Sequence, residues 1–284
     1  MGKKIDNEWD ITMSPSAGLI KFNLLEVWKY RDLMFLLVKR DFIAFYKQTI
    51  LGPLWFLIQP IFTTVTFVFI FGNLAKISTE GIPSPLFYIC SISAWSFFSE
   101  CLTKTSSVFR DNANIFGKVY FPRLIMPLSI ILSTLVKFGI QIFIILIFII
   151  YYYFNGYIIN FSEYILILPF IIILMSLQGL GFGMIISALT TKYRDLALLL
   201  TFGIQLLMYA TPIAYPLSSL SGNIRFIIKL NPLSNLIEGF RKSILNCGTF
   251  TSFDLLISSG TTFFILIIGL IIFNKVEKNF VDTI

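Results

Sequence analysis

The fold is decided by residues 126–153, which read MPLSIILSTLVKFGIQIFIILIFIIYYY. Lys137 is the single charged side chain in this stretch. An α-helix of about 20 apolar residues crosses a hydrocarbon core about 30 Å thick, so the stretch predicts a transmembrane helix. Helices are the expected spanning element because each one satisfies its own backbone hydrogen bonds in lipid.

Further apolar runs lie on both sides of this one, at residues 54–74, 85–102, 164–189, 196–214 and 255–273. We therefore predict an all-α integral membrane protein with six transmembrane helices. The composition agrees, because 56% of the 284 residues are hydrophobic, 13% are charged and the mean hydropathy is +0.83. These values are far from the balance of a soluble domain.

The basic residues predict the orientation of these helices. Of the 22 Lys and Arg residues, 16 fall on the side of the two termini and 5 on the other, and Lys137 lies within a span. Because cytoplasmic loops carry the excess of basic residues, both termini are predicted to be cytoplasmic. The net charge of +7 is interpreted as this bias, so no nucleic-acid partner is expected. The first fifty residues contain no apolar signal-peptide core, so the first span is expected to direct insertion.

The sequence argues against an enzyme. It has no histidine, and its three cysteines are scattered, so no catalytic residue, metal site or disulfide is expected. The nearest candidate for a nucleotide-binding P-loop is Gly117-Lys118, which Val119 follows, and Asn112 stands where the first glycine belongs. A membrane glycosyltransferase would need paired acidic residues at a membrane boundary, whereas the acids here are interpreted as isolated: Glu100, Asp111 and Glu238.

An amphipathic helix is predicted at residues 31–52, after a cytoplasmic arm at residues 1–30. Phe35, Val38, Phe42 and Phe45 recur there at steps of three and four. The pattern suits a helix along the cytoplasmic membrane interface, which serves either as a membrane-surface anchor or as a docking site for a partner. Residues 53–284 are assigned to the six-span domain.

Two spans carry polar and aromatic stripes. The first stripe holds Trp55, Gln59, Phe62, Thr63, Thr66, Phe69 and Asn73, and the second holds Thr201, Gln205, Met208 and Pro212. Such stripes either line a substrate path or form hydrogen bonds between helices. Lys137 requires a partner or water unless a tilted helix places it at a shallow depth. Gly179 and Gly183, four residues apart, predict a face where two helices pack closely.

Three loops are also informative. Residues 103–123 include the polar segment Arg110–Asn114, which predicts a short exposed cytoplasmic helix, and residues 192–195 form a second basic turn; either is alternatively a solvated loop. On the outer side, residues 216–247 predict two short helices in a re-entrant hairpin. Asn231 is expected to be the N-cap of the second helix, Pro232 its first residue and Gly248 its stop.

The chain resembles the type-2 ABC exporter permeases for cell-surface polysaccharides, meaning the O-antigen exporter membrane subunit and its teichoic-acid counterpart. The resemblance extends over residues 20–273 and rests on these segments: Leu51-Gly52-Pro53-Leu54-Trp55 with Pro60, Lys118-Val119-Tyr120-Phe121-Pro122-Arg123 with Pro127, Tyr193-Arg194-Asp195, Thr211-Pro212, Asn231-Pro232-Leu233 and Phe240-Arg241.

The resemblance implies a homodimer in the bacterial cytoplasmic (inner) membrane that exports a polysaccharide linked to undecaprenyl diphosphate. Two copies of a separate P-loop ABC ATPase would bind ATP and magnesium, so the chain itself is expected to hold no cofactor. Teichoic acid, capsule or a smaller lipid or drug are alternative substrates, and a membrane glycosyltransferase or a structural assembly protein is a more distant alternative.

The resemblance also implies roles for individual residues. The ATPase-coupling residues would be Arg110, Asp111, Asn112, Asn114, Tyr193, Arg194 and Asp195. The channel-lining residues would be Trp55, Gln59, Phe62, Thr66, Phe69, Trp95, Gln205 and Tyr209. The hairpin would act as an outer gate with Pro216, Asn231, Pro232, Glu238 and Arg241. Candidates to bind the lipid diphosphate are Lys39, Arg40, Lys47 and Arg123, whose alternative role is topology and contact with anionic membrane lipid.

Overall fold

The computed structural model describes residues 24–47, 50–116, 121–157, 162–193 and 195–280. Within these ranges all regular secondary structure is helical, as predicted. Five helices of the described chain are long and apolar enough to cross a membrane, and each overlaps a predicted span. They are α3 (Trp55–Phe67) with its π-helical continuation η2 (Val68–Leu74), α4 (Ser84–Ser106), α7 (Ile125–Phe154), α8 (Leu168–Lys192) after the 3-10 turn η3 (Glu163–Ile167), and α12 (Ser252–Phe280).

The predicted span at residues 196–214 is shorter in the structure. Its helix, α9 (Leu196–Tyr209), has 14 residues and ends before Pro212. A proline has no N–H to donate and disfavours the helical conformation of the residue before it, here Thr211. At a rise of 1.5 Å per residue α9 is about 21 Å long, which is less than the hydrocarbon core of about 30 Å.

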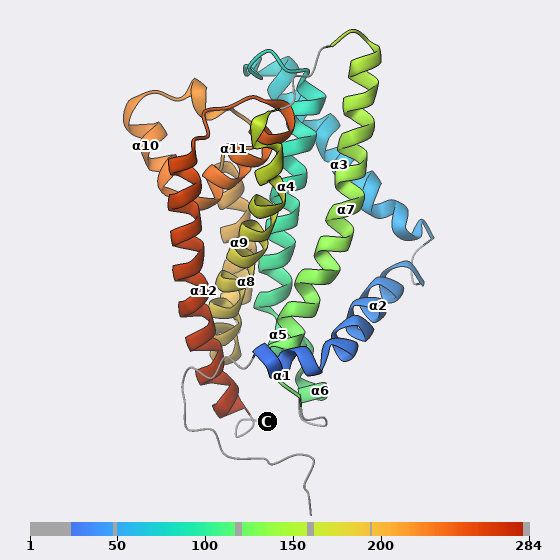
Figure 1. Ribbon diagram of the computed structural model, residues 1–284, viewed down its shortest axis with the longest axis vertical. Coiled ribbons are helices and arrows are strands. Elements are labelled where there is room, and N and C mark those ends of the chain that lie inside the picture. Colours follow the sequence, from blue (N-terminus) through green and yellow to red (C-terminus); the bar gives the residue numbers. More distant parts are fainter. Residues whose placement is uncertain (1–23, 48–49, 117–120, 158–161, 194, 281–284) are drawn as a thin grey trace, which may run out of the picture.

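α4 is the central helix of the bundle (Figure 1). In its most apolar window 78% of the residues are buried, compared with 11% in α3 and η2. α3, α7, α8, α9 and α11 (Pro232–Leu245) all pack against it. Its interior position explains why α4 combines apolar side chains with small polar ones that bond the backbone of their own helix, as Ser91 does.

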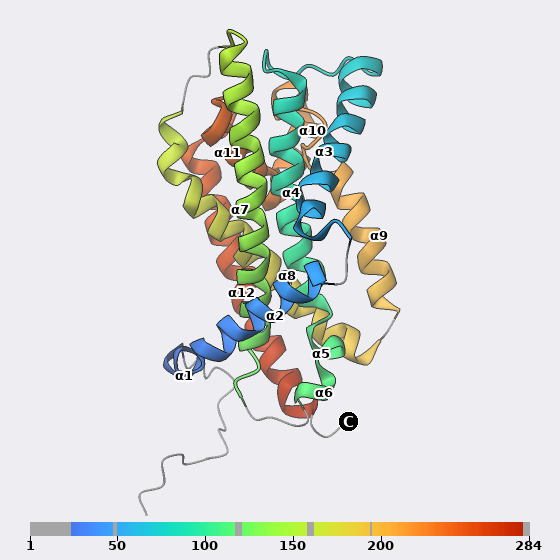
Figure 2. The same cartoon turned by 90° about the vertical axis from the view of Figure 1, so that its right-hand side faces the viewer.

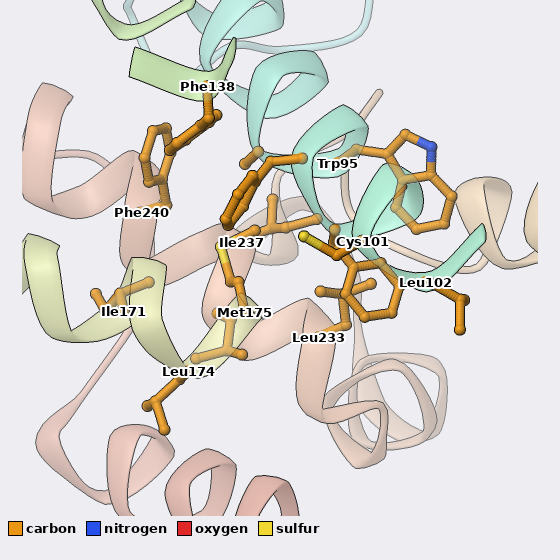
Figure 3. Close-up of a cluster of buried hydrophobic side chains, with 14 of the residues drawn as sticks. Trp95, Cys101, Leu102, Phe138, Ile171, Leu174, Met175, Leu233, Ile237 and Phe240 are labelled. Atoms are coloured by element: carbon orange, nitrogen blue, oxygen red, sulfur yellow. The ribbon is translucent and has the colours of Figure 1, made fainter. Parts of the chain in front are cut away.

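The core lies where α4, α7, α8 and α11 meet (Figure 3). Phe138 of α7 stacks on Phe97 of α4 with ring centroids 4.4 Å apart, and its ring lies 5.8 Å from that of Phe240 on α11. Met175 of α8 and Ile237 of α11 are fully buried in the same cluster. The short helix α11 is therefore part of the bundle core rather than a surface loop.

Small residues allow α8 to approach two helices closely. A Cβ atom on Gly183 would lie 2.5 Å from Cβ of Thr105 in α4, and one on Gly179 would lie 2.8 Å from Cβ of Cys101. On the other side of α8, a Cβ atom on Gly269 of α12 would lie 2.6 Å from the carbonyl oxygen of Gly181. The predicted close packing at Gly179 and Gly183 is confirmed, with α4 as the partner.

Replacing Gly183 with valine is expected to destabilise the fold by about 1 to 3 kcal/mol, because the added atoms must displace Thr105 or separate α4 from α8. The thermal unfolding midpoint of the detergent-solubilised protein measures this effect. Gly260→Val is the matched control, since nothing lies within 4 Å of a Cβ atom at Gly260. Equal midpoints for the two variants would contradict the packing assignment.

The N-terminal helices α1 (Leu24–Lys29) and α2 (Arg31–Lys47) cross the side of the bundle obliquely (Figure 2). α2 packs against α7 and buries Leu37, which is 4% exposed. Phe35, which the sequence placed on the apolar face, is 63% exposed. Leu37 is not part of the repeating phenylalanine pattern, so the pattern did not identify it as a residue that α2 buries.

Short helices lie at both ends of the bundle (Figure 1). α5 (Val108–Asp111) and α6 (Ala113–Phe116) lie beside the start of α7, and we call this the α5–α6 end. At the opposite end, the α10–α11 end, the turn η4 (Leu217–Ser219) precedes α10 (Gly222–Leu230) and α11. Asn231 is the N-cap of α11, since its side chain accepts a hydrogen bond from the Leu233 N–H at 3.1 Å. The helix ends at Asn246, which has φ 53°, two residues before the predicted stop.

Candidate functional site

The polar and aromatic stripes lie on the outside of the single chain. The predicted channel-lining residues that are exposed on α3, η2 and α9 are Trp55, Gln59, Phe62, Thr66, Phe69, Gln205 and Tyr209. Phe62 is 69% exposed and Tyr209 is 68% exposed, so these large side chains face away from the bundle. We call this surface the α3–α9 face.

Trp95 does not belong to this face. It is 6% exposed in α4, and its ring centroid lies 6.0 Å from that of Phe98 on the same helix. The prediction from aromatic content alone did not distinguish an interior tryptophan from one that faces outward.

The two helices that carry the stripes are neighbours. Both pack against α4, and near the α10–α11 end they line a common cavity of about 90 Å³ with Phe67 and Phe71 on one side and Met208 and Tyr209 on the other. The exposed side chains of α3 and α9 therefore form neighbouring parts of one surface.

Threonines of the two stripes bond to their own helices. Thr63 donates to the Gln59 carbonyl at 2.9 Å, Thr66 to the Phe62 carbonyl at 2.9 Å and Thr201 to the Ala197 carbonyl at 3.1 Å. Their hydroxyl protons are thus used within the helix. Aromatic rings, amides and hydroxyl oxygens remain on the surface for contact with another molecule.

A polar pocket of about 240 Å³ lies between α3, α4 and α7. Trp55, Phe56, Gln59, Pro60 and Thr63 line it from α3, Ser96, Ser99 and Glu100 from α4, and Lys137 and Gln141 from α7. Trp55 and Gln59 also belong to the α3–α9 face. The pocket is therefore adjacent to that face, and the sequence did not predict that these three helices would meet in this way.

Lys137 is paired at the wall of this pocket. Its ammonium nitrogen lies 2.6 Å from Oε1 of Glu100, which also lies 2.6 Å from the ammonium of Lys104. The Lys137 nitrogen is 5.0 Å from the ring centroid of Phe56. The side chain of Lys137 is only 8% exposed, whereas that of Glu100 is 31% exposed. The partner of Glu100 is 37 positions away in the sequence and on another helix, so the sequence alone did not show this ion pair.

The predicted coupling residues gather at the α5–α6 end. Arg110 and Asp111 of α5 are exposed, as are Tyr193 and Asp195 in the turn after α8. The Thr190 hydroxyl donates to the Ser106 carbonyl at 3.2 Å and joins that turn to the end of α4. Asn112 follows α5, and the backbone of Asn114 lies in α6, whereas Arg194 lies outside the described residues.

α5 is anchored to the bundle through an aromatic contact. Phe109, which is 1% exposed, stacks on Phe273 of α12 with ring centroids 4.6 Å apart. Its ring also lies 5.9 Å from that of Phe116 in α6. A displacement of α5 would therefore act directly on α12.

A buried ion pair holds the predicted gate helix α11. Arg241 is 0% exposed and pairs with Glu238, one turn earlier. One guanidinium nitrogen of Arg241 donates to the Ser91 hydroxyl of α4 and to the Pro212 carbonyl after α9, each at 3.2 Å. Pro216 is buried in the segment that leads to α10, and Pro232 begins α11. Arg241 thus links three parts of the chain.

The four residues predicted to bind a diphosphate do not line the polar pocket. Lys39, Arg40 and Lys47 are exposed on α2, and Arg40 pairs with Asp41 at 2.8 Å. The Arg123 guanidinium lies 5.7 Å from the ring centroid of Phe116. In the described part of the chain, no group of three or more His, Cys, Asp or Glu side chains is arranged to hold a metal ion.

Comparisons with known proteins identify a family and similar relatives. The profile described as "ABC-2 type transporter" matches residues 32–245. A protein of Klebsiella pneumoniae named "O-antigen export system permease protein RfbA" is 29% identical over 263 residues, which cover 93% of this chain and 98% of the relative. A protein of Myxococcus xanthus with the same name is 25% identical over 219 residues, which cover 76% of this chain and 81% of the relative.

Proposed function

Because the chain belongs to the ABC-2 type transporter family, we propose that it is the membrane subunit of an ABC exporter for an O-antigen type polysaccharide. A separate ATPase drives the export. Similarity over almost the full length to permeases named for O-antigen export supports this substrate class.

The observation that carries the proposal is the α3–α9 face. Large aromatic side chains and amides there point away from the chain's own core, and α3 with η2 is buried over only 11% of its most apolar window. Polar side chains in a membrane helix face protein or water rather than lipid. Two copies of the chain that face each other through this surface enclose a path between them.

Aromatic and amide side chains suit a polysaccharide. The C–H faces of sugar rings pack on aromatic rings, and hydroxyl groups bond to amides. Phe62, Phe69 and Tyr209 supply such rings along the path, and Gln59 and Gln205 supply the amides. The polysaccharide is carried on undecaprenyl diphosphate.

The α5–α6 end is the cytoplasmic side. The positive-inside rule assigns it there, since Lys104, Arg110, Arg123 and Lys192 lie in or beside the segments at this end. The ATPase docks on α5, α6 and the turn around Tyr193. α10 and α11 then lie at the outer side as gate helices between α9, the fifth of the six crossings, and α12, the sixth.

Deletion of the gene tests the export function. The strain is expected to lose surface polysaccharide and to accumulate lipid-linked polysaccharide inside the cell, and the intact gene is expected to restore export. Co-expression of the chain with a P-loop ABC ATPase of the same organism, followed by purification through a tag on this chain, tests the partnership. Undiminished surface polysaccharide in the deletion strain would refute the proposal.

A further inference from the structure

Glu100, the carboxylate in the wall of the polar pocket between α3, α4 and α7, is shared by two ammonium groups: that of Lys137, which lines the pocket, and that of Lys104, which does not line it. Lys104 and Lys137 both lie 2.6 Å from one carboxylate oxygen of Glu100. Two ammonium groups and one carboxylate leave one positive charge in this cluster. Asp41 also acts electrostatically on Lys104, but its carboxylate is paired with Arg40 at 2.8 Å. The described residues around the pocket therefore favour an anionic ligand.

Burial makes this charge effective. Lys137 is 8% exposed and Phe56 covers part of its ammonium group, so water screens the charge poorly. The charge also lies inside α7 and far from either end of the helix, where a basic residue would instead contribute to orientation. An ionisable side chain in the interior of a membrane helix is a candidate for a functional site, because burying a charge there is costly.

The rest of the pocket wall suits a small polar group next to the anion. Trp55 provides an aromatic face, Gln59 and Gln141 provide amides, and Ser96, Ser99 and Thr63 provide hydroxyls. Oε1 of Gln141 is a buried acceptor with no hydrogen-bond partner in the described structure. The volume of about 240 Å³ is below the range of about 300 to 1,000 Å³ that drug-sized ligands occupy. The pocket thus fits a phosphate ester together with one small polar substituent.

We propose that this pocket binds the phosphate ester of a lipid-linked or lipid headgroup ligand, with Lys137 facing the phosphate and Trp55 and Gln141 facing its polar substituent. The inference rests on the proposed export function for the identity of the cargo. Trp55 and Gln59 belong to both the pocket and the α3–α9 face, so a headgroup in the pocket stays in contact with the export path.

The experiment measures binding to the full-length chain in lipid nanodiscs made of a zwitterionic lipid. Three probes separate the sources of the phosphate: inorganic pyrophosphate, a short polyprenyl diphosphate sugar, and phosphatidylglycerol added to the nanodisc. Affinity for pyrophosphate is read by isothermal titration, and the two lipids are tested as competitors of pyrophosphate. Competition by the polyprenyl diphosphate sugar alone assigns the pocket to the cargo, whereas competition by phosphatidylglycerol alone assigns it to a membrane lipid. Both outcomes support a phosphate pocket.

Two substitutions with opposite expected effects test the assignment. Lys137→Gln removes one positive charge and is expected to weaken pyrophosphate binding by about 10-fold or more, as for a charge-assisted hydrogen bond. Glu100→Gln removes the carboxylate and is expected to strengthen binding by about 3-fold or more, because the Lys137 ammonium then faces the anion without a competing carboxylate. Loss of folding cannot produce tighter binding. Lys192→Gln, which replaces the exposed last residue of α8, is the matched control and is expected to leave the affinity for pyrophosphate unchanged.

The inference is overturned if the wild-type chain binds none of the three probes. It is equally overturned if Lys137→Gln and Glu100→Gln bind pyrophosphate as the wild type does. The export function is tested separately by surface polysaccharide in the deletion strain. Normal export in that strain refutes the proposed function. If export depends on the chain but the two variants bind pyrophosphate as the wild type does, only the proposed pocket is refuted.

Discussion

Replacing Arg241 with methionine is expected to lower the free energy of unfolding by about 3 to 5 kcal/mol, because the substitution leaves the Glu238 carboxylate buried without its cation. Glu238 is 1% exposed, and its other described contact is a hydrogen bond from the Thr249 N–H at 3.2 Å. The substitution also removes the guanidinium from its position 4.2 Å from the ring centroid of Phe87. Chemical denaturation of the protein in detergent, followed by tryptophan fluorescence, measures the loss.

A double variant separates the ion pair from the packing. Glu238→Gln with Arg241→Met leaves no buried charge at this site and is expected to recover most of the stability lost in the single variant. Arg40→Met is the comparison for an exposed pair, since the side chains of Arg40 and Asp41 are 44% and 31% exposed and lie 2.8 Å apart; its cost is expected to be about 1 kcal/mol or less. A double variant no more stable than Arg241→Met would show that the charge is not the cause.

Reversing the charge of Arg110 is expected to reduce export by about 10-fold or more without loss of stability. The Arg110 side chain is 66% exposed and its pair with the neighbouring Asp111 is exposed as well, so Arg110→Glu should change the stability of the chain by less than about 0.5 kcal/mol. At an interface, a like-charge contact costs several kcal/mol, and each 1.4 kcal/mol is about tenfold in affinity. The affinity for the ATPase and the amount of surface polysaccharide are the two measurements.

The control for this variant is Glu163→Lys. It also reverses an exposed charge, but it lies in η3 at the α10–α11 end and should leave ATPase binding unchanged. Normal surface polysaccharide in the Arg110→Glu strain would remove α5 from the docking site. Equal losses in both strains would point to a general defect in membrane insertion rather than to the ATPase interface.

Properties that depend on one helix at a time were predictable from the sequence. The long apolar runs predict α3, α4, α7, α8 and α12, and the capping role of Asn231 follows from the proline after it. Pro212 was a local signal that α9 ends early. The signal was overlooked because the span was assigned from the apolar run as a whole. The spacing of Glu238 and Arg241, three residues apart on one helix, was a further signal of a pair that sequence reasoning missed.

Properties that depend on how helices rotate against each other were not predictable. Glu100 and Lys137 meet because α4 and α7 turn those faces toward one another, and no local pattern in either helix states this. Trp95 and Trp55 have the same side chain, but one helix is central and the other peripheral. The polar pocket combines residues of three helices, so neither Gln141 nor Ser99 was a candidate before the helices were placed.

The glycines on both sides of α8 have a mechanical consequence. At Gly183 the backbone of α8 lies against the Thr105 side chain of α4, and at Gly181 it lies against the backbone of α12 at Gly269, so we expect α4, α8 and α12 to move together as one rigid unit. Phe109 of α5 stacks on α12, so α5 belongs to the same rigid unit. A force applied at α5 is then expected to tilt α4, α8 and α12 together. α3 and α9 bury little of their surface in the chain, so they are the helices that this tilt can move relative to the rest of the bundle.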